Sequence, residues 1–323
     1  MKHDQYKIRN LNIEDLKDII EIFKSNYRIE QSNFKRFVSF DEIEKETIER
    51  LSYMLVNHFG WAVILDDRLV GYLVGFEVGP LFGKDLGVVV PLHGHGSVLE
   101  EKNTIYQLLF EHAAAYWTKK DIFSIAITMF AHDESLKSFW FQNGFGMRCV
   151  DAIRNLEDID ISHDQLMIKE IKENHLDDLL ELHQKHNLSY RRSPLFMPNP
   201  DEDAKSDLLS WFDEKDRYLW AAYINDIPVG YMRIQKTGES VISHAESMMN
   251  ITGAYVDPNY RGLMIGSLLL KHINDWTKKH HYKFLGVDYE SINPEANRFW
   301  KKYFKPYTIS LTRRIDENIH HYL

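Results

Sequence analysis

The sequence has a single cysteine, Cys149, among its 323 residues. One thiol excludes an internal disulfide framework and a zinc site built from cysteines. Long hydrophobic runs are also missing: no stretch approaches the ~20 apolar residues that span a bilayer. The first residues lack the apolar core of a secretion signal. We therefore expect a cytoplasmic protein with no membrane partner.

Positive charge is not in excess either. The chain has 39 Lys and Arg residues against 48 Asp and Glu residues, a formal net charge of −9. Without a basic surface to attract phosphates, nucleic acid is not an expected partner, and the acidic balance favours a cationic amine as substrate. A chain of this length with 44% hydrophobic residues is long enough for two domains.

Two common nucleotide motifs are absent as well. The chain has neither the Gly-x-x-x-x-Gly-Lys-Ser/Thr loop nor a Gly-x-Gly-x-x-Gly that opens a helix. Residues 253–270 offer another anion site. An apolar run stops at Asp257-Pro258, because proline cannot continue a strand ladder. A loop with Arg261, Gly262 and Gly266 follows, and a helical pattern begins at once.

A strand, a tight loop and a helix N-terminus point backbone N–H groups and the positive end of the helix dipole at an anion. Glycines let the backbone approach that anion, and an arginine adds a fixed charge. The segment therefore predicts a pyrophosphate site. A plain connection between strand and helix is the alternative reading of the same glycines.

The chain repeats itself with a shift of about 160 positions. The matches are Leu16, Ile19, Ile20 and Phe23 with Leu176, Leu179, Leu180 and His183, Trp61-Ala62 with Trp220-Ala221, Val70-Gly71-Tyr72 with Val229-Gly230-Tyr231, and Phe139-Trp140 with Phe299-Trp300. Matches in one order at nearly one offset indicate a duplication. We predict domains at 1–154 and 166–323, joined by a charged linker at 155–165.

Strands alternate with helices in each half, which predicts an α/β (α+β) fold with a mixed, mostly antiparallel sheet flanked by helices. Pro91 matches Pro258 only at an offset of 167. We therefore expect seven or eight extra residues in the second copy, within 235–250. On this alignment Leu92–Ser97, which has two histidines and no arginine, is a degenerate anion loop kept for structure. With no third ligand nearby we expect no metal.

These motifs resemble those of the GNAT-superfamily N-acetyltransferases. Residues 167–315 carry the resemblance, and 6–154 look like a diverged copy. Its first element is the Arg/Gln-x-x-Gly-x-Gly/Ala loop after Val-x-Pro, here Arg261–Gly266 after Val256-Asp-Pro258. Its second is the Asn-x-x-Ala-x-x-aromatic-aromatic helix, here Asn293 to Phe299-Trp300. The resemblance implies a tandem GNAT fold that uses acetyl-CoA.

The resemblance also implies which residues hold that cosubstrate. They are the end of the strand, the loop with the first turn of the helix, and the later aromatic helix: Ala254, Tyr255, Val256, Arg261, Gly262, Leu263, Met264, Ile265, Gly266, Ser267, Asn293, Phe299 and Trp300. Met264 stands where the family usually has a glycine, and we expect it to need no positive φ. Trp300 stands where many members carry a tyrosine that protonates the departing thiolate.

The implied reaction moves the acetyl group of acetyl-CoA directly to a primary amine in a ternary complex in the C-terminal domain. A backbone N–H near Ala254–Val256 would hold the oxyanion. Glu246 and Glu290 are candidate bases and Tyr255 a candidate proton donor. The acceptor is a small molecule or an N-terminal amine, and we expect a monomer or homodimer. The alternative is a regulatory module that binds acyl-CoA without turnover.

Overall fold

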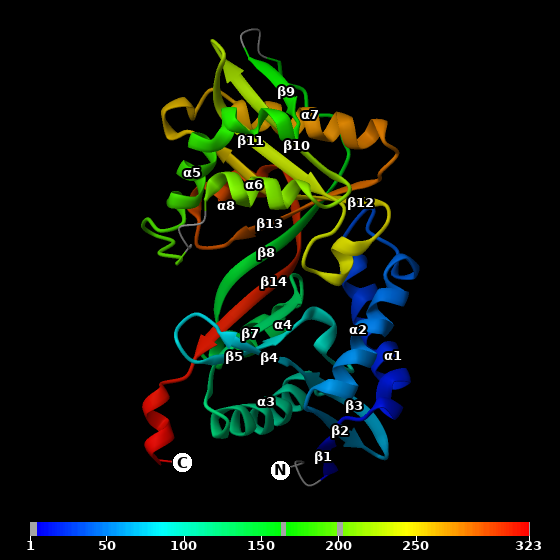
Figure 1. Ribbon diagram of the computed structural model, residues 1–323. Helices are drawn as coiled ribbons and strands as arrows, with labels where there is room; N and C mark the ends of the chain where they lie inside the picture. Colours follow the sequence, from blue (N-terminus) through cyan, green and yellow to red (C-terminus); the bar gives the residue numbers. More distant parts are fainter. Residues whose placement is uncertain (1–4, 163–165, 199–202, 323) are drawn as a thin grey trace. The chain divides into compact units, whose positions relative to one another are not determined.

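The computed structural model describes residues 5–162, 166–198 and 203–322. The chain divides into two compact units. The first comprises residues 1–151, 240–242 and 306–323, and the second residues 152–239 and 243–305. Figure 1 shows the elements of each unit in the colours of the sequence.

The first unit has two sheets, with strand orders β1-β2-β3-β6 and β4-β5-β7-β14, and β8 lies beside β14. Its strands are β1 (Lys7–Asn10), β2 (Gly60–Leu65), β3 (Arg68–Val74), β4 (Phe76–Pro80), β5 (Leu86–Val90), β6 (His95–Ser97), β7 (Ile122–Phe130), β8 (Gly146–Asn155) and β14 (Lys305–Arg314). Its helices are α1 (Leu16–Gln31), α2 (Glu44–Asn57), α3 (Lys102–Lys119) and α4 (Glu134–Gln142). As its spacing predicts, α1 buries Ile19, Ile20 and Phe23.

The second unit has one sheet with the order β13-β12-β11-β10-β9, in which only the β12–β13 pair is parallel among the recorded pairings. Its strands are β9 (Met167–Ile171), β10 (Arg217–Ile224), β11 (Ile227–Gln235), β12 (Met248–Val256) and β13 (Phe284–Glu290). Its helices are α5 (Leu180–Ser189), α6 (Ala204–Phe212), α7 (Ile265–Lys279) and α8 (Pro294–Tyr303). The predicted α/β fold of two similar domains with mixed, mostly antiparallel sheets is confirmed.

Helices cover both faces of the second sheet (Figure 1). Consecutive residues of a strand point to opposite faces, and two residues of β11 show this. A Cβ placed on Gly230 would lie 3.1 Å from Ile265 of α7. The next side chain, Tyr231, instead hydrogen-bonds to histidines of α5. Thus α7 and α5 lie on opposite faces.

Strand β12 is shared between two neighbours. It pairs with β13 from Met248 to Ile251, whereas its pairing with β11 continues to Val256. β13 therefore leaves β12 after Ile251. On that side, the N–H and C=O groups of β12 after Ile251 do not pair with β13 as the groups before them do. The two strands open toward their C-terminal ends.

The last strand of the chain belongs to the first unit. β14 pairs antiparallel with β7, from Thr308 opposite Phe130 to Arg314 opposite Ser124. Its inward residues Tyr307, Ile309 and Leu311 are buried. The predicted boundaries at 154 and 166 follow the repeat in the sequence, whereas packing assigns residues 306–323 to the first unit.

Strand register corrects the alignment of the two copies. Ser97 lies opposite Gly71 in the first unit, and Val256 lies opposite Gly230 in the second. Ser97 therefore corresponds to Val256 as Gly71 does to Gly230, and each correspondence is a shift of 159 positions. The match of Pro91 with Pro258 is therefore wrong, and no insertion of seven or eight residues precedes the second loop. The counterpart of β12 in the first unit is instead broken by a 3₁₀ turn at Leu92–Gly94.

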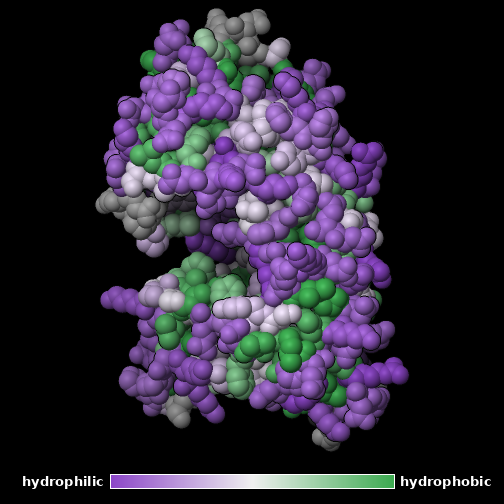
Figure 2. Space-filling model, turned by 45° about the vertical axis from the view of Figure 1, so that its right-hand side comes forward, coloured by the Kyte–Doolittle hydropathy of each residue, from purple (hydrophilic) through white to green (hydrophobic). Residues whose placement is uncertain are grey.

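Hydrophobic residues gather on part of the first unit's surface, in the lower half of Figure 2. Tyr53 and Val56 of α2 are 63% and 70% exposed, and Phe59 nearby is 44% exposed. Phe59 stacks on Tyr116 with ring centroids 4.8 Å apart.

Within 5–162, 166–198 and 203–322, no helix has the length and apolar character to cross a bilayer.

Candidate active site

A cleft of about 950 Å³ lies in the second unit where β12 and β13 separate. The N-terminus of α7 and the first turns of α8 complete its walls. Every residue expected to hold acetyl-CoA lines this cleft except Leu263, which is exposed on the loop. Two of the expected catalytic residues, Tyr255 and Glu290, line it too. Glu246 does not.

Two residues with positive φ shape the loop that enters α7. Gly262 has φ +85°, and Met264 has φ +58° and ψ 12° as the residue before the helix. The expectation that Met264 needs no positive φ is wrong. The turn places it in the left-handed region, where a residue with a Cβ is strained and glycine is not. This explains why a glycine would suit the position.

The loop is held at its start by Asp257. The Asp257 carboxylate accepts hydrogen bonds from the Asn259 N–H (2.9 Å) and the Lys185 ammonium (3.0 Å). The Asn259 N–H, followed by the nearby Lys185, lowers the pKa of this carboxyl below its usual range. Arg261 donates to the Val256 carbonyl (3.2 Å) and pairs with Glu295 of α8. Its guanidinium therefore lies between the end of β12 and the first turn of α8.

The N-terminus of α7 suits an anion. The first N–H groups of a helix have no acceptor within it, and Met264 provides no side-chain cap. The first turn also contains no acidic residue. A Cβ on Gly262 would meet no atom within 4 Å, so the space beside the loop is open. These features fit a pyrophosphate, because backbone N–H groups, the helix dipole and Arg261 would all face it.

Helix α8 packs closely against that first turn. A Cβ on Gly266 would lie 3.3 Å from the Phe299 ring, so glycine permits this approach. Asn293 accepts hydrogen bonds from the Glu295 and Ala296 N–H groups and thereby caps α8. Trp300 is buried in the cleft wall. The indole is not acidic, so this position lacks the proton donor that a tyrosine would provide.

The candidate catalytic residues lie in different surroundings. Glu290 is at the end of β13 in the cleft wall, half-buried. Tyr255 is 8% exposed, and burial, with nearby Asp257, raises the pKa of its phenol. Glu246 is exposed in the turn before β12, and its main-chain carbonyl accepts a hydrogen bond from Lys236. A side chain in that turn is placed at the far end of β12 from the opening.

The opposite end of the cleft is formed by α5 and the chain after it. His186, Tyr190 and Arg192–Leu195 line this end. The proline-rich segment 193–200 borders the cleft in its first part. Residues 199 and 200 lie outside the described residues. Because α5 and α7 lie on opposite faces of the sheet, the cleft connects the two faces through the gap between β12 and β13.

Buried histidines on α5 were not identified as site residues from the sequence. His183 and His186 are 2% and 9% exposed. They lie three positions apart on a helix whose neighbouring buried residue is Leu182. Polar residues at the apolar positions of an amphipathic helix are the signal that would have found them.

The first unit has a different loop at the matching place. Only Val98–Glu101 separate Ser97 from α3, and Glu101 has φ 54° before the helix as Met264 does. Two adjacent glutamates, Glu100 and Glu101, end this shorter loop where the second copy has Leu263 and Met264, and the loop contains no arginine or glycine. Acidic side chains at this place repel an anion. Leu92–Ser97, the loop expected to be degenerate, is instead buried strand and turn.

The histidines of that segment are structural. His95 Nδ1 lies 2.7 Å from the Tyr106 hydroxyl, and Nε2 lies 2.7 Å from the Thr128 carbonyl. Burial lowers the pKa of His95 to about 4 and that of His93 to about 3. Both are therefore neutral core residues at pH 7. In the described ranges, no three or more His, Cys, Asp or Glu side chains gather as metal ligands.

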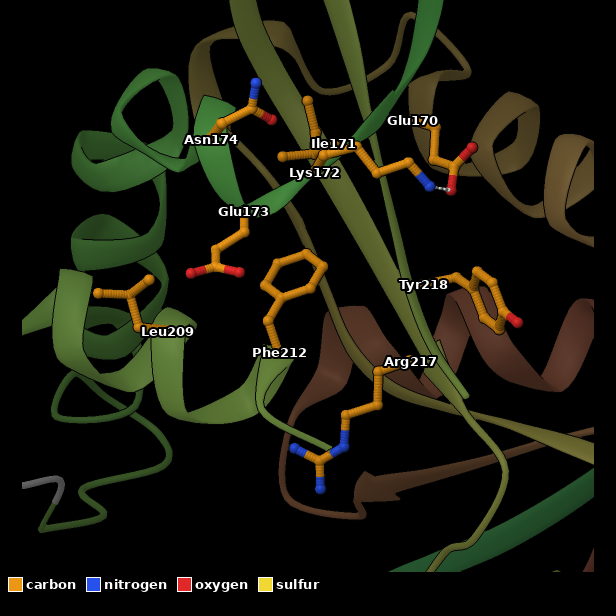
Figure 3. A pocket seen from close by; sticks show the side chains of 9 residues that line it. All are labelled: Glu170, Ile171, Lys172, Glu173, Asn174, Leu209, Phe212, Arg217 and Tyr218. Carbon is orange, nitrogen blue, oxygen red and sulfur yellow. Dashed lines mark hydrogen bonds and ion pairs between the residues drawn. The ribbon is translucent and has the colours of Figure 1, made fainter. Parts of the chain in front are cut away.

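The second unit has another hollow, of about 560 Å³, between β9, α6 and β10. Figure 3 shows Lys172 joined to Glu170 by an ion pair, with Phe212 between Glu173 and Arg217. Arg217 is itself paired with Glu214 and donates to the Trp211 carbonyl. None of the expected site residues lines this hollow.

Residues 179–304 match the model of the acetyltransferase (GNAT) family. This part of the chain, within the second unit, matches a GNAT domain. No curated protein sequence matches the chain, so the remaining comparisons are with solved structures. The GNAT match includes the α7 loop, α8 and the α5 histidines. The match indicates acetyl transfer as the general chemistry.

Three solved structures resemble nearly the whole chain. A GCN5-related N-acetyltransferase from Sphaerobacter thermophilus has a TM-score of 0.62 and 12% identity, with 96% of each chain covered. A tandem GNAT protein from the clavulanic acid biosynthesis pathway has a TM-score of 0.53 and 14% identity, with 96% of this chain and 98% of that one covered. The GNAT region of a fungal multi-domain GH3 β-N-acetylglucosaminidase, described as a glucosamine N-acetyltransferase region, has a TM-score of 0.56 and 13% identity. Here 95% of this chain is covered, but only 38% of the fungal protein.

At these identities the likeness concerns the fold alone. It extends over both units and therefore confirms the tandem fold of two similar domains, which the internal repeat predicts and the resemblance identifies as GNAT-like.

Proposed function

We propose that the second unit transfers an acetyl group from acetyl-CoA directly to a primary amine in a ternary complex. The observation that supports this most is the cleft itself. It joins an uncapped helix N-terminus with Arg261 on one face of the sheet to a histidine and an arginine on the other. A CoA pyrophosphate fits the first end, and an acceptor fits the second.

The chemistry follows from the separation of β12 from β13. A thioester placed between the strands brings its carbonyl oxygen to the N–H groups that β13 no longer faces. The amine nitrogen attacks the carbonyl carbon, and the oxyanion is held by these N–H groups. The C–S bond then breaks, and the CoA thiolate leaves with a proton from solvent or from the acceptor. No covalent enzyme intermediate is required.

The first test is binding. Calorimetry should detect acetyl-CoA binding to the full chain, and Arg261→Ala should weaken it roughly tenfold or more, since a hydrogen bond to a charged group contributes about 1.5–3 kcal/mol. Arg68→Ala, an exposed arginine of the first unit, is the matched control and should leave the affinity unchanged. Equal affinities for all three proteins would place the pyrophosphate elsewhere.

The second test is turnover. Free thiol released from acetyl-CoA is measured with spermidine, tyramine, glucosamine and a peptide that begins with alanine. Release above the hydrolysis background with any of these amines supports the transferase. Tight binding without release for every amine favours the alternative, a regulatory module that binds acyl-CoA. Trp300 is the residue that keeps this alternative open, because it cannot return a proton to the thiolate.

A further inference from the structure

A chain of hydrogen bonds crosses the interior of the second unit and ends at the cleft. Asp207 Oδ2 of α6 lies 2.5 Å from His183 Nε2, and His183 Nδ1 lies 2.7 Å from the Tyr231 hydroxyl. The same hydroxyl lies 2.6 Å from His186 Nδ1. His183 and Tyr231 are almost fully buried, and both Tyr231 and His186 border the cleft.

The far nitrogen of His186 faces the open side. Its Nε2 makes no hydrogen bond to any residue that the structure describes, and it is not sealed from solvent. The ring stacks on Tyr255, with centroids 5.1 Å apart, and packs against Tyr190. These contacts fix the ring plane. His186 Nε2 is therefore a fixed basic nitrogen on the side of the sheet opposite the α7 loop.

The proton positions along the hydrogen-bond chain can be assigned by starting from Asp207. The hydrogen bond from His183 keeps the pKa of Asp207 below its usual range, so Asp207 is a carboxylate and only accepts. His183 Nε2 then donates to Asp207, and its Nδ1 accepts the proton of the Tyr231 hydroxyl. Tyr231 Oη in turn accepts from His186 Nδ1–H. This order leaves His186 Nε2 with a free electron pair.

The first copy lacks this chain of hydrogen bonds. Tyr72 is the counterpart of Tyr231, but the positions of His183 and His186 are Phe23 and Asn26. Tyr72 donates instead to the His93 carbonyl, and Asn26 donates to the Ser97 carbonyl. The first copy therefore packs its core at these positions without histidines. The fold itself does not require the hydrogen-bond chain of the second unit.

We propose that His186 is the general base for the amine and that Tyr231, His183 and Asp207 relay its proton. The inference rests on the proposed function. His186 Nε2 takes one proton from the amine as its nitrogen bonds to the acetyl carbon. The Nδ1 proton of His186 moves to Tyr231, and the Tyr231 proton moves to His183 Nδ1. The charge ends as a His183 imidazolium paired with the Asp207 carboxylate.

This route explains how a buried histidine acts as a base. Burial lowers the pKa of His186 to about 3, with His183 and Arg233 as further causes, so a charge that stayed on His186 would be unfavourable. The relay leaves His186 neutral before and after the transfer. Asp207 is the counter-charge, while Arg233, which lies over Trp211, opposes the charge, and Tyr190, Tyr231 and Tyr255 are the other titratable groups facing the pair.

The kinetic test breaks the relay at its middle. Tyr231→Phe keeps the ring and removes the hydroxyl, so acetyl-CoA affinity should stay within threefold while kcat falls about 100-fold, the lower end for loss of general base catalysis. His186→Gln should lose as much. In Tyr231→Phe and Asp207→Asn, the acid limb of kcat/KM should move to lower pH, because isolated His186 is a weaker base.

Tyr106→Phe is the matched control. It removes the same kind of buried tyrosine–histidine hydrogen bond in the first unit and should leave kcat and its pH profile unchanged. A Tyr231→Phe enzyme with wild-type kcat and an unmoved acid limb would overturn the relay.

A second measurement needs no turnover. Long-range ¹H–¹⁵N spectra of the full chain with ¹⁵N-labelled histidines report each tautomer. We expect His186 in the Nδ1–H form, assigned by His186→Gln, and a proton on Nε2 of His186 would contradict the relay. If acetyl-CoA neither binds nor is cleaved, the proposed function fails, and the tautomers still decide whether the hydrogen-bond chain exists as described.

Discussion

Met264→Gly should stabilise the protein, because it relieves backbone strain. A residue with a Cβ in the left-handed region costs about 1–2 kcal/mol, and Met264 has φ +58°. Glycine offsets about 0.5–1 kcal/mol of that gain, because the unfolded chain has greater conformational entropy with glycine at this position. The side chain is 48% exposed, so little burial is lost. The net gain is about 0.5–1 kcal/mol, or a Tm rise of roughly 2–3 °C.

Thermal unfolding of three variants measures this. Met264→Ala keeps a Cβ and should give no gain, which isolates φ as the cause. Glu101→Gly, at the matching position with φ 54°, should stabilise by a similar amount. Acetyl-CoA affinity should stay within about twofold of wild type in both glycine variants, since the backbone N–H groups remain. A Met264→Gly protein less stable than wild type would refute the strain argument.

Three further predictions concern the loop before α7, the stability of the protein at low pH, and strand β14. Gly262→Val should weaken acetyl-CoA binding through strain at φ +85°, measurable by calorimetry, and an unchanged Kd would contradict a role for this loop geometry. Burial holds the pKa of His93 and His186 at about 3 and of His95 at about 4, below the ordinary 6.5. The unfolded chain then binds protons that the native chain does not, so stability falls as pH drops below about 6.5. At pH 5 each histidine should cost about 2 kcal/mol in urea titrations, and equal midpoints at pH 5 and 7 would exclude this. Deletion of residues 306–323 should destabilise the first unit while the second retains acetyl-CoA binding, and calorimetry with limited proteolysis distinguishes the two.

The repeat and the anion loop were predictable because both depend on local patterns. Paired dipeptides at one offset identify two copies, and a strand that stops at Asp257-Pro258 before a helical pattern indicates the loop. The register around Pro91 was not predictable, since a 3₁₀ turn that breaks a strand leaves no local mark in a glycine- and histidine-containing segment. Prolines at unlike places in the two copies therefore gave a wrong match.

Two other features depend on contacts between distant residues. The left-handed conformation of Met264 belongs to the turn that leads from β12 into α7, and methionine itself favours no such turn. The link from Asp207 to His186 joins α6, α5 and β11, which only the folded sheet brings together. His183 even matched Phe23 in the repeat as if it were an ordinary core residue, so its chemistry appeared only with its partners.

The place of β14 also determines when the first unit can be completed during synthesis. Residues 1–151 leave the ribosome first, yet the strand that pairs with β7 follows only after the whole second unit has been made. Until then the apolar edge of β7, from Ile122 to Phe130, lacks its neighbour and is open to pairing with other chains. Whatever shields that edge in the cell must act for the time it takes to translate more than half of the protein.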